Sequence, residues 1–292
     1  MSKRTTIGIA VRPGIPKAIE LAKQVVAFAK SHGHKILLEK ETAKILGSRQ
    51  RGVSELELAN SADPIVVLGG DGTLIGIAHF VKGGSPTLVG VNFGHLGFLT
   101  ELAPEELMTA LPNVLSGKAK FGERSMLLAE VIRKNKVIFS SQGVNEAVVL
   151  KAAEAPLLDI DFAVDQEAVM RLRADGMIIA TSTGSTAYSL AAGGSIVYPA
   201  LPVLLVTPLC PHSLTVRPLI LRLDSVLSLS FPPYEGKVVL SVDGQVSTEL
   251  QTGDRVRISR CKNSVRFVRS PSRSYFEILR AKLNWGIANK AD

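Results

Sequence analysis

The stretch IVVLGGDGT, residues 65–73, joins a short apolar run to a glycine-rich turn. Four consecutive branched apolar residues predict a buried strand of a parallel sheet. Three glycines in four positions allow positive φ angles and leave backbone N–H groups uncovered, so a phosphate group can approach the main chain where a helix begins. We therefore predict a phosphate-binding loop made of Gly69, Gly70, Gly72 and Thr73.

Asp71 places a single carboxylate inside this loop. A carboxylate repels phosphate, and its presence makes sense if it accepts a proton from an attacking hydroxyl group or holds a divalent cation between phosphates. Both roles belong to phosphoryl transfer, in which positioning and charge neutralisation supply most of the catalysis. On these five residues alone, a simple tight turn is the alternative explanation.

Up to about residue 116, the chain alternates short apolar runs with segments of helical periodicity. This alternation predicts an α/β domain with a parallel sheet covered by helices. Beyond that point, short β-rich runs separated by Gly, Pro, Asp or Asn predict a mostly antiparallel, sandwich-like domain. Near the end, Phe276, Leu279 and Leu283 recur at helical spacing and predict a terminal helix. The predicted division is 1–118, 119–270 and 271–292.

The 292 residues include 46% apolar and 21% charged side chains. This balance is typical of soluble globular proteins and excludes disordered, collagen-like and coiled-coil chains. No uncharged run approaches the roughly 18 residues that a membrane-spanning helix requires, so we expect a cytoplasmic protein without a membrane partner. The two cysteines are isolated in the sequence, which indicates neither a disulfide framework nor a zinc site.

Basic residues gather in the last part of the chain. The net charge is +8, and residues 251–292 alone hold ten basic and three acidic residues, or +7. This asymmetry fits a nucleic-acid-binding surface or an attraction for small polyanions. In RVRISR and RFVR, however, the cations alternate with Val, Ile and Phe, which is typical of a solvated strand face. We favour the strand face and expect no nucleic-acid partner.

Two common nucleotide-binding motifs are missing. The sequence has no G-x-x-x-x-G-K-[ST], which excludes a Walker-type phosphate site, and no G-x-G-x-x-G. No acidic residue follows Gly72 by about 20 positions to bind a ribose, so a hydride-transferring dehydrogenase fits poorly. A second glycine turn, at residues 92–101, follows another strand-like run, and its His95 is a candidate phosphate contact.

Further polar groups follow the strand-like runs of the second half. Asn145 supplies an amide that can recognise an adenine edge, and Glu146 supplies a carboxylate that can accept two hydrogen bonds from a ribose diol. The hydroxyl-rich segment 182–189 predicts a polar pocket at a helix start, where Tyr188 offers a stacking face to a base. The run DGQ at residues 243–245 has hairpin-turn chemistry and is expected to contribute only a polar tip.

Seven segments, in this order, resemble the bacterial NAD kinase family: GGDGT, NFGHLGF, GVNE, RADG, TGSTAYSLAAGG, PHSLTVRPL and DGQ. They extend from Gly69 almost to the terminal helix, and GVNE with TGSTAYSLAAGG and DGQ is far more specific than GGDGT, which lipid kinases share. The resemblance implies phosphorylation of the adenosine ribose 2′-hydroxyl group of NAD to give NADP. It implies ATP as the phosphoryl donor and a divalent metal cation, Mg²⁺, as cofactor.

The resemblance also implies a Rossmann-like N-terminal domain, a β-rich C-terminal domain and a terminal helix that returns to the first domain. Asp71 matches the family's catalytic proton acceptor, and no protein ligand set for a metal is assigned. The positions that match NAD-binding residues are Asp71, Gly72, Asn145, Glu146, Arg173, Asp175, Thr186, Ala187, Tyr188, Ser189 and Gln245. Pro156 and Ala191 depart from the family pattern, which often has a basic residue and a serine there. A homodimer or homotetramer is implied as well.

Two other functions stay open at this point. A lipid kinase shares GGDGT but needs an apolar acceptor pocket, which the polar pair Asn145 and Glu146 disfavours. A non-catalytic nucleic-acid-binding protein would use the basic segment 251–292, and its affinity would fall steeply with salt.

Overall fold

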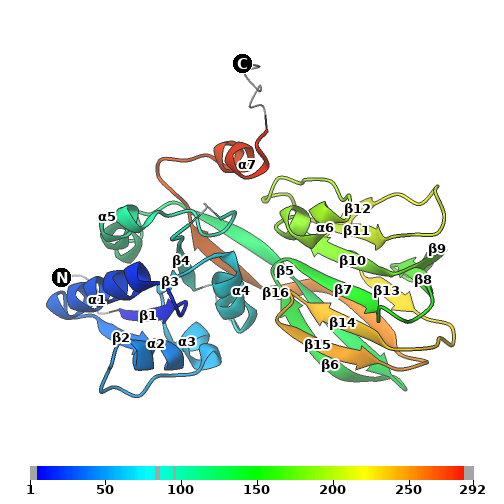
Figure 1. Cartoon of the computed structure of the whole chain (residues 1–292), viewed down its shortest axis with the longest axis horizontal. Helices are drawn as coiled ribbons and strands as arrows, with labels where there is room; N and C mark the ends of the chain where they lie inside the picture. The colour runs from blue at the N-terminus through cyan, green and yellow to red at the C-terminus, as the bar shows by residue number, and fades with distance from the viewer. Residues whose placement is uncertain (1–4, 83–85, 95–96, 286–292) are drawn as a thin grey trace. The chain divides into compact units, whose positions relative to one another are not determined.

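The computed structural model describes residues 5–82, 86–94 and 97–285. The chain forms two compact units: unit 1 holds Met1–Glu123 and Val265–Asp292, and unit 2 holds Arg124–Ser264. The chain passes between them within two long strands, β5 (Phe121–Arg133) and β16 (Arg255–Val268), both labelled in Figure 1. Unit 2 is therefore an insertion into the sequence of unit 1. The division into folding domains at residues 118 and 270 stays a prediction.

Unit 1 is built on a parallel sheet with the strand order β2-β1-β3-β4-β16. Its strands are β1 (Thr6–Val11), β2 (Lys35–Leu38), β3 (Ile65–Leu68), β4 (Thr87–Val91) and the end of β16. Both β3 and β4 are buried along their whole length, as continuous apolar strands of a parallel sheet are. The predicted α/β domain is confirmed.

The helices of unit 1 lie between or after these strands in the chain (Figure 1). They are α1 (Pro16–Ser31), α2 (Lys40–Ile45), α3 (Glu55–Ser61), α4 (Asp71–His79), α5 (Pro104–Leu115) and α7 (Tyr275–Leu283). Helix α1 places Leu21 and Val25 in the same core as Ile9 and Leu68, because residues four apart share one helix face. No described helix is long and apolar enough to cross a membrane.

Helix α7 returns the last part of the chain to unit 1, as predicted. A capping box starts the helix, and Tyr275, Ile278 and Leu279 are buried. Phe276, between two of these residues, is 56% exposed. Burial of Tyr275 and Ile278, three residues apart, turns the intervening position outward.

Unit 2 is a sandwich of antiparallel strands, which confirms the predicted β-rich fold. One sheet has the order β12-β11-β10-β7-β14-β15. The other joins β16, β13, β8 and β9, and in it β5 pairs with β16 and β6 pairs with β5. The bounds are β6 (Lys136–Gly143), β7 (Glu146–Lys151), β8 (Leu158–Val164), β9 (Glu167–Ala174), β10 (Gly176–Thr181), β11 (Val203–Leu209), β12 (Leu219–Arg222), β13 (Leu227–Ser230), β14 (Val238–Val242) and β15 (Val246–Leu250). A short 3₁₀ turn (Gly184–Thr186) and helix α6 (Tyr188–Ala191) follow β10.

The two sheets of unit 2 share one core. Val149 and Ile179 from the first sheet lie in the same apolar cluster as Ile160, Leu172 and Leu229 from the second. Alternate residues of each strand face inward, as the two-residue period of a strand requires. This rigid core supports the strand ends and turns that carry the polar candidate residues.

Strands β7 and β10 approach each other unusually closely at Gly176. A Cβ atom at this position would lie 2.0 Å from the carbonyl oxygen of Val149. We expect Gly176→Ala to lower the free energy of unfolding by about 2–3 kcal/mol, because backbone atoms of two central strands must move apart.

Urea denaturation of both variants checks this expectation. The matched control is Gly72→Ala, in the first turn of α4, where a Cβ atom meets no other atom within 4 Å. Alanine is expected to stabilise this helical position by up to about 1 kcal/mol. Equal effects of the two substitutions would contradict the close approach.

Candidate active site

The glycine-rich loop ends β3 and starts α4, as predicted. Asp71 is the first residue of α4, and Gly70 is its N-cap with φ −81°. Gly69, Gly70 and Gly72 do not use the positive φ angles that glycine allows. Glycine is required at position 69 by a close approach instead: a Cβ atom there would lie 2.8 Å from Thr73 Oγ1 and 2.9 Å from the Cβ atom of Arg12.

The carboxylate of Asp71 holds the segment 98–100, which follows β4. Its Oδ1 atom accepts hydrogen bonds from the N–H groups of Leu99 (3.2 Å) and Thr100 (2.9 Å) and from the Thr100 hydroxyl group (2.7 Å). Its Oδ2 atom accepts one, from the N–H group of Phe98 (2.9 Å). Three donors occupy Oδ1 and one occupies Oδ2, so Oδ2 keeps more capacity to accept a further hydrogen.

Glycine at position 97 makes this arrangement possible. A Cβ atom at Gly97 would lie 2.1 Å from both Asp71 Oδ1 and Thr100 Oγ1. The second glycine turn therefore supports the acidic residue of the first, at the carboxyl edge of the parallel sheet where ligands enter open α/β folds. His95, the candidate phosphate contact of this turn, lies outside the described residues.

Asp71 opens into a cavity of about 430 Å³ within unit 1. Arg12, Gly70, Asn92 and Lys282 also line it, so two cations flank the single acid among its described lining residues. Lys282 comes from α7 and lies 5.8 Å from the centroid of the Phe98 ring. A cavity with helix N–H groups, one carboxylate and two cations has the chemistry to bind a polyphosphate.

The sequence analysis missed Arg12 and Lys282. Arg12 directly follows β1, so its place at the carboxyl edge of the sheet was a usable signal. Lys282 is more than 200 positions from Asp71 in the sequence, and nothing near it marks a site. Only the return of α7 to unit 1 brings it to this cavity.

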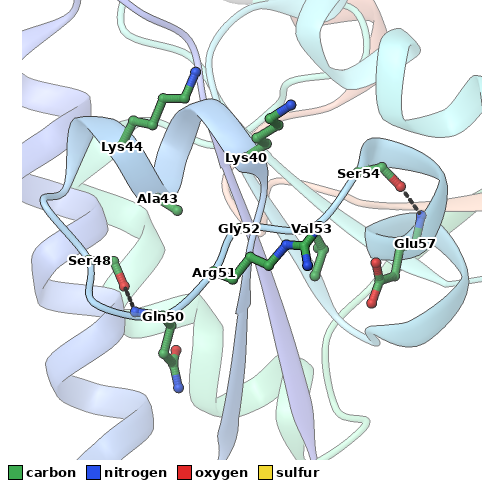
Figure 2. Close-up of a pocket in the computed structure, with 10 residues that line it drawn as sticks. All are labelled: Lys40, Ala43, Lys44, Ser48, Gln50, Arg51, Gly52, Val53, Ser54 and Glu57. Atoms are coloured by element: carbon green, nitrogen blue, oxygen red, sulfur yellow. Dashed lines mark hydrogen bonds between the residues drawn. The ribbon is translucent and has the colours of Figure 1, made fainter.

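A larger hollow, of about 690 Å³, lies beside α2 and α3 (Figure 2). Lys40 and Lys44 extend from α2 there, and Arg51 lies on the loop toward α3. Lys44 is already paired with Glu41 at 2.7 Å, and none of the predicted site residues lines this hollow. Volume alone therefore does not locate the chemistry in unit 1.

In unit 2, Asn145 and Glu146 lie where β7 begins, as predicted. Glu146 is only 8% exposed, and it accepts a hydrogen bond from the backbone N–H group of Tyr188. Its Oε2 atom is buried and accepts no hydrogen bond from the described residues. Burial, and then the nearby charge of Asp243, raise the pKa of Glu146 to about 8. A buried carboxyl group with an open oxygen atom is prepared for a ligand.

The segment 182–189 lies against this pair. A Cβ atom at Gly184 would lie 2.3 Å from the carbonyl oxygen of Asn145, so the turn and the strand start are in direct contact. Thr186 and Ala187 are half-buried, and Tyr188 is 43% exposed, which leaves its ring available to a base.

Two of the predicted NAD-binding residues have unexpected surroundings. The side chain of Ser189 is fully buried, and its hydroxyl group is 2.9 Å from Thr207 Oγ1. Gly194 packs closely against this hydroxyl group, since a Cβ atom at position 194 would lie 2.3 Å from Ser189 Oγ. The hydroxyl group therefore faces the interior and not a ligand. Gln245 is exposed on the β14–β15 turn. Asp243 of the same turn points inward, so the turn is more than the polar tip that was predicted.

Asp175 lies between β9 and β10, beside the end of β7, and Arg173 lies on β9, in the other sheet of unit 2. Arg173 is 3.3 Å from Asp159, and Asp175 is 3.3 Å from Lys151, so they are paired with other residues and not with each other. The backbone carbonyl oxygen of Asp175 accepts a hydrogen bond from the N–H group of Lys151, which is five residues along β7 from Glu146. This spacing corresponds to about 17 Å of strand. A single chain thus does not bring this pair together with Asn145 and Glu146.

Family models of known proteins match both units of the chain. Residues 7–119 match the family model of the ATP-NAD kinase N-terminal domain, and residues 144–270 match that of the C-terminal domain. The chain is 41% identical over 280 residues to the NAD kinases of Syntrophotalea carbinolica and Geobacter sulfurreducens, with 96% of this chain and 98% of each relative covered. The chain belongs to the NAD kinase family. NAD kinases phosphorylate NAD with ATP to give NADP, and this chain is such a phosphotransferase.

Solved structures of NAD kinases share the fold. A yeast NADH kinase complexed with NADH superimposes with a TM-score of 0.89 at 26% identity, over 99% of this chain and 90% of that one. An Archaeoglobus fulgidus NAD kinase in complex with ATP has a TM-score of 0.73 at 24% identity, over 94% and 99% of the two chains. The Rossmann-like first domain and the β-rich second domain implied by the motifs are confirmed.

The raised pKa of Glu146 predicts a pH-dependent stability. Unfolded glutamate ionises near pH 4.3, whereas Glu146 in the folded chain ionises near pH 8. The stability that the protonated Glu146 contributes is therefore fully present below about pH 4.3 and is lost as the pH rises toward 8. Glu146→Gln removes this titration, and we expect the variant to be more stable than the wild type at pH 7 by about 3 kcal/mol.

Urea denaturation at pH 4.5, 7 and 8 measures this difference. The exposed Glu154→Gln serves as the matched control and is expected to change the free energy of unfolding by less than about 0.5 kcal/mol at each pH. A gain for Glu146→Gln that stays constant with pH would contradict the buried, protonated carboxyl group.

Proposed function

We propose that Asp71 accepts the proton of the adenosine ribose 2′-hydroxyl group as that oxygen attacks the γ-phosphorus of ATP. The observation that carries this role is a carboxylate at the N-terminus of α4 that opens into a cavity flanked by Arg12 and Lys282. Oδ2, with one hydrogen bond, is the accepting atom. A carboxylate is too weak a base to remove this proton beforehand, so proton transfer accompanies a loose transition state.

Arg12 and Lys282 bind the phosphates of ATP, together with the backbone of Gly69, Gly70 and Gly72. The Arg12 guanidinium lies 3.9 Å from the position of a Cβ atom at Gly70, so the cation borders the phosphate loop. The first N–H groups of α4 have no acceptor within the helix and carry the positive end of its dipole. Thr73 adds a hydroxyl group at the same turn.

The donor set of the cavity fits a divalent cation that is carried with ATP. The described residues contain no group of three or more His, Cys, Asp or Glu side chains that would hold a metal by themselves. Mg²⁺ is usually bound by one or two carboxylates and the phosphates of the substrate, and here it would be held chiefly by the phosphates of ATP. When bound, the cation neutralises charge on the phosphates.

Asn145 and Glu146 bind the adenosine end of NAD. The buried, unsatisfied Oε2 atom of Glu146 supports this role, because a ribose diol supplies the missing hydrogen bonds. Tyr188 stacks on the adenine, Thr186 and Ala187 contact it, and Gln245 contacts the dinucleotide. Ser189 takes part through its backbone, because its hydroxyl group is bonded to Thr207.

Arg173 and Asp175 serve the nicotinamide half of NAD. The distance of Asp175 from Glu146 along β7 favours either an extended dinucleotide or a contribution from a second copy of the chain. We therefore keep a homodimer or homotetramer as part of the proposal, in a cytoplasmic protein.

The basic segment 251–292 does not favour a nucleic-acid-binding function. Arg257, Arg266, Arg269 and Arg273 each pair with an acidic residue of their own unit at 2.7–3.8 Å. These pairs neutralise much of the cationic surplus locally.

Asp71→Asn is expected to keep NAD binding and to lose turnover by a factor of about 100 or more, because the proton acceptor is gone. A coupled assay of NADP formation, with NAD binding measured by calorimetry, tests this. Thr100→Val is the matched control: it removes one donor to Asp71 Oδ1 but keeps the carboxylate, and a loss below about tenfold is expected. Equal losses would assign Asp71 to loop support and not to proton transfer.

Arg12→Gln and Lys282→Gln are each expected to raise KM for ATP about tenfold or more while KM for NAD changes little, because a charge-assisted phosphate contact is lost. Lys23→Gln, in an exposed pair with Glu20 on α1, is the control and should leave both constants unchanged. Initial-rate kinetics in both substrates measure the effect. An unchanged KM for ATP in both cavity variants would remove these residues from the ATP site.

A further inference from the structure

The β14–β15 turn does more than reverse the chain. Asp243 and Gly244 have φ angles of 52° and 63°, as the two central residues of a type I′ hairpin turn require. The carboxylate of Asp243 points inward, where Oδ2 accepts a hydrogen bond from the N–H group of Val144 at 2.7 Å. Oδ1 accepts two more, from Asn145 at 2.8 Å and Glu146 at 3.0 Å.

From this arrangement we infer that Asp243 is a positioning residue for substrate recognition: its carboxylate binds three consecutive backbone N–H groups and fixes the side chains of Asn145 and Glu146 toward the adenosine end of NAD. The inference rests on the proposed role of Asn145 and Glu146 in NAD binding. It assigns the aspartate of the DGQ run to the same binding site without direct contact to the ligand.

The backbone of residues 144–146 is held from both sides. On one side, the Asp243 carboxylate accepts hydrogen bonds from the N–H groups of these three residues. The N–H group of Asp243 in turn donates to the Glu146 carbonyl oxygen at 2.9 Å. On the other side, the N–H group of Thr181 donates to the Asn145 carbonyl oxygen at 2.8 Å, and its hydroxyl group donates to Val144. The main chain is thus saturated, which leaves the side chains of Asn145 and Glu146 for a ligand.

Glycine before this segment lets the turn come close. A Cβ atom at Gly143 would lie 2.8 Å from Val242 Cγ1 and 3.1 Å from Asp243 Oδ1. A larger residue would push the carboxylate away from the three N–H groups. Two distant runs, GVNE and DGQ, therefore form one structural unit.

Asp243 also controls the charge of Glu146. It is the charged group that faces Glu146 from the β14–β15 turn, while α6 contributes the backbone N–H group of Tyr188 and β10 pairs through Ala180. Burial raises the pKa of Asp243 as well, but three backbone N–H groups oppose that rise by favouring its ionised form. Glu146 accepts one such hydrogen bond, from Tyr188, so the proton stays on Glu146 and the negative charge on Asp243. After burial, the charge of Asp243 is the second cause that raises the pKa of Glu146 to about 8.

The test is the pH dependence of kcat/KM for NAD in the full chain, with KM for ATP measured beside it. Glu146 accepts hydrogen bonds from the ribose in its ionised form, so the wild-type value rises through a midpoint near pH 8. Asp243→Asn keeps a residue that tolerates a positive φ angle. We expect its high-pH plateau to fall at least about tenfold, and its midpoint to fall below that of the wild type, because the second cause of the raised pKa is removed.

Asp243→Glu keeps the charge but displaces the carboxylate by one methylene group. It is expected to lower the plateau while the midpoint stays near that of the wild type. Asp224→Asn, at an exposed position paired with Arg222, is the control and should change neither quantity. KM for ATP is expected to stay within about twofold in all variants, because an NAD-specific contact is changed.

Glu146→Gln separates this inference from the proposed function. If it leaves KM for NAD unchanged, the proposed role of Glu146 fails. If it raises KM for NAD while Asp243→Asn changes neither plateau nor midpoint, the positioning role fails. A lower plateau with an unmoved midpoint in Asp243→Asn would also overturn the inference. Should this variant not fold, an unchanged KM for NAD in Asp243→Glu overturns it.

Discussion

A carboxylate bound by successive backbone N–H groups organises the candidate site in each unit. In unit 1, Asp71 accepts the N–H groups of residues 98–100. In unit 2, Asp243 accepts those of residues 144–146. Each acid therefore ties one loop to another loop that is distant in the sequence. Because charge-assisted hydrogen bonds are strong and directional, side chains beside them acquire fixed positions without a long element of secondary structure.

The two carboxylates differ in what surrounds them. Asp71 opens into a cavity with two cations, whereas Asp243 has its oxygens filled by N–H groups and a buried Glu146 beside it. The same anchoring device thus leaves one acid available for chemistry and uses the other as support. The difference lies in the neighbouring groups. Arg12 and Lys282 line the cavity beside Asp71, whereas Asp243 lies beside the buried Glu146, whose Oε2 atom accepts no hydrogen bond from the described residues.

The sequence predicted the strands, the glycine loop and the acid that follows β3, because these depend on local apolar runs and glycine spacing. It did not predict why Gly69 is glycine, since contact with Arg12 depends on the pairing of β1 with β3. It placed Ser189 toward a ligand, and the packing of Thr207 from β11 hides that hydroxyl group. Asp243 looked like a surface tip because type I′ turns usually are, and only the tertiary contact with residues 144–146 turns it inward.

The nested order of the two units has a consequence for synthesis on the ribosome. Residues 124–264 emerge as one uninterrupted block and can close their sandwich while the chain is still growing. Unit 1 must wait, because its sheet lacks the end of β16 and the cavity beside Asp71 lacks Lys282 until residues 265–285 have emerged. The unit that carries Asn145 and Glu146 can thus be complete before the unit that carries Asp71, and a prematurely terminated chain would have a closed sandwich attached to an unfinished parallel sheet.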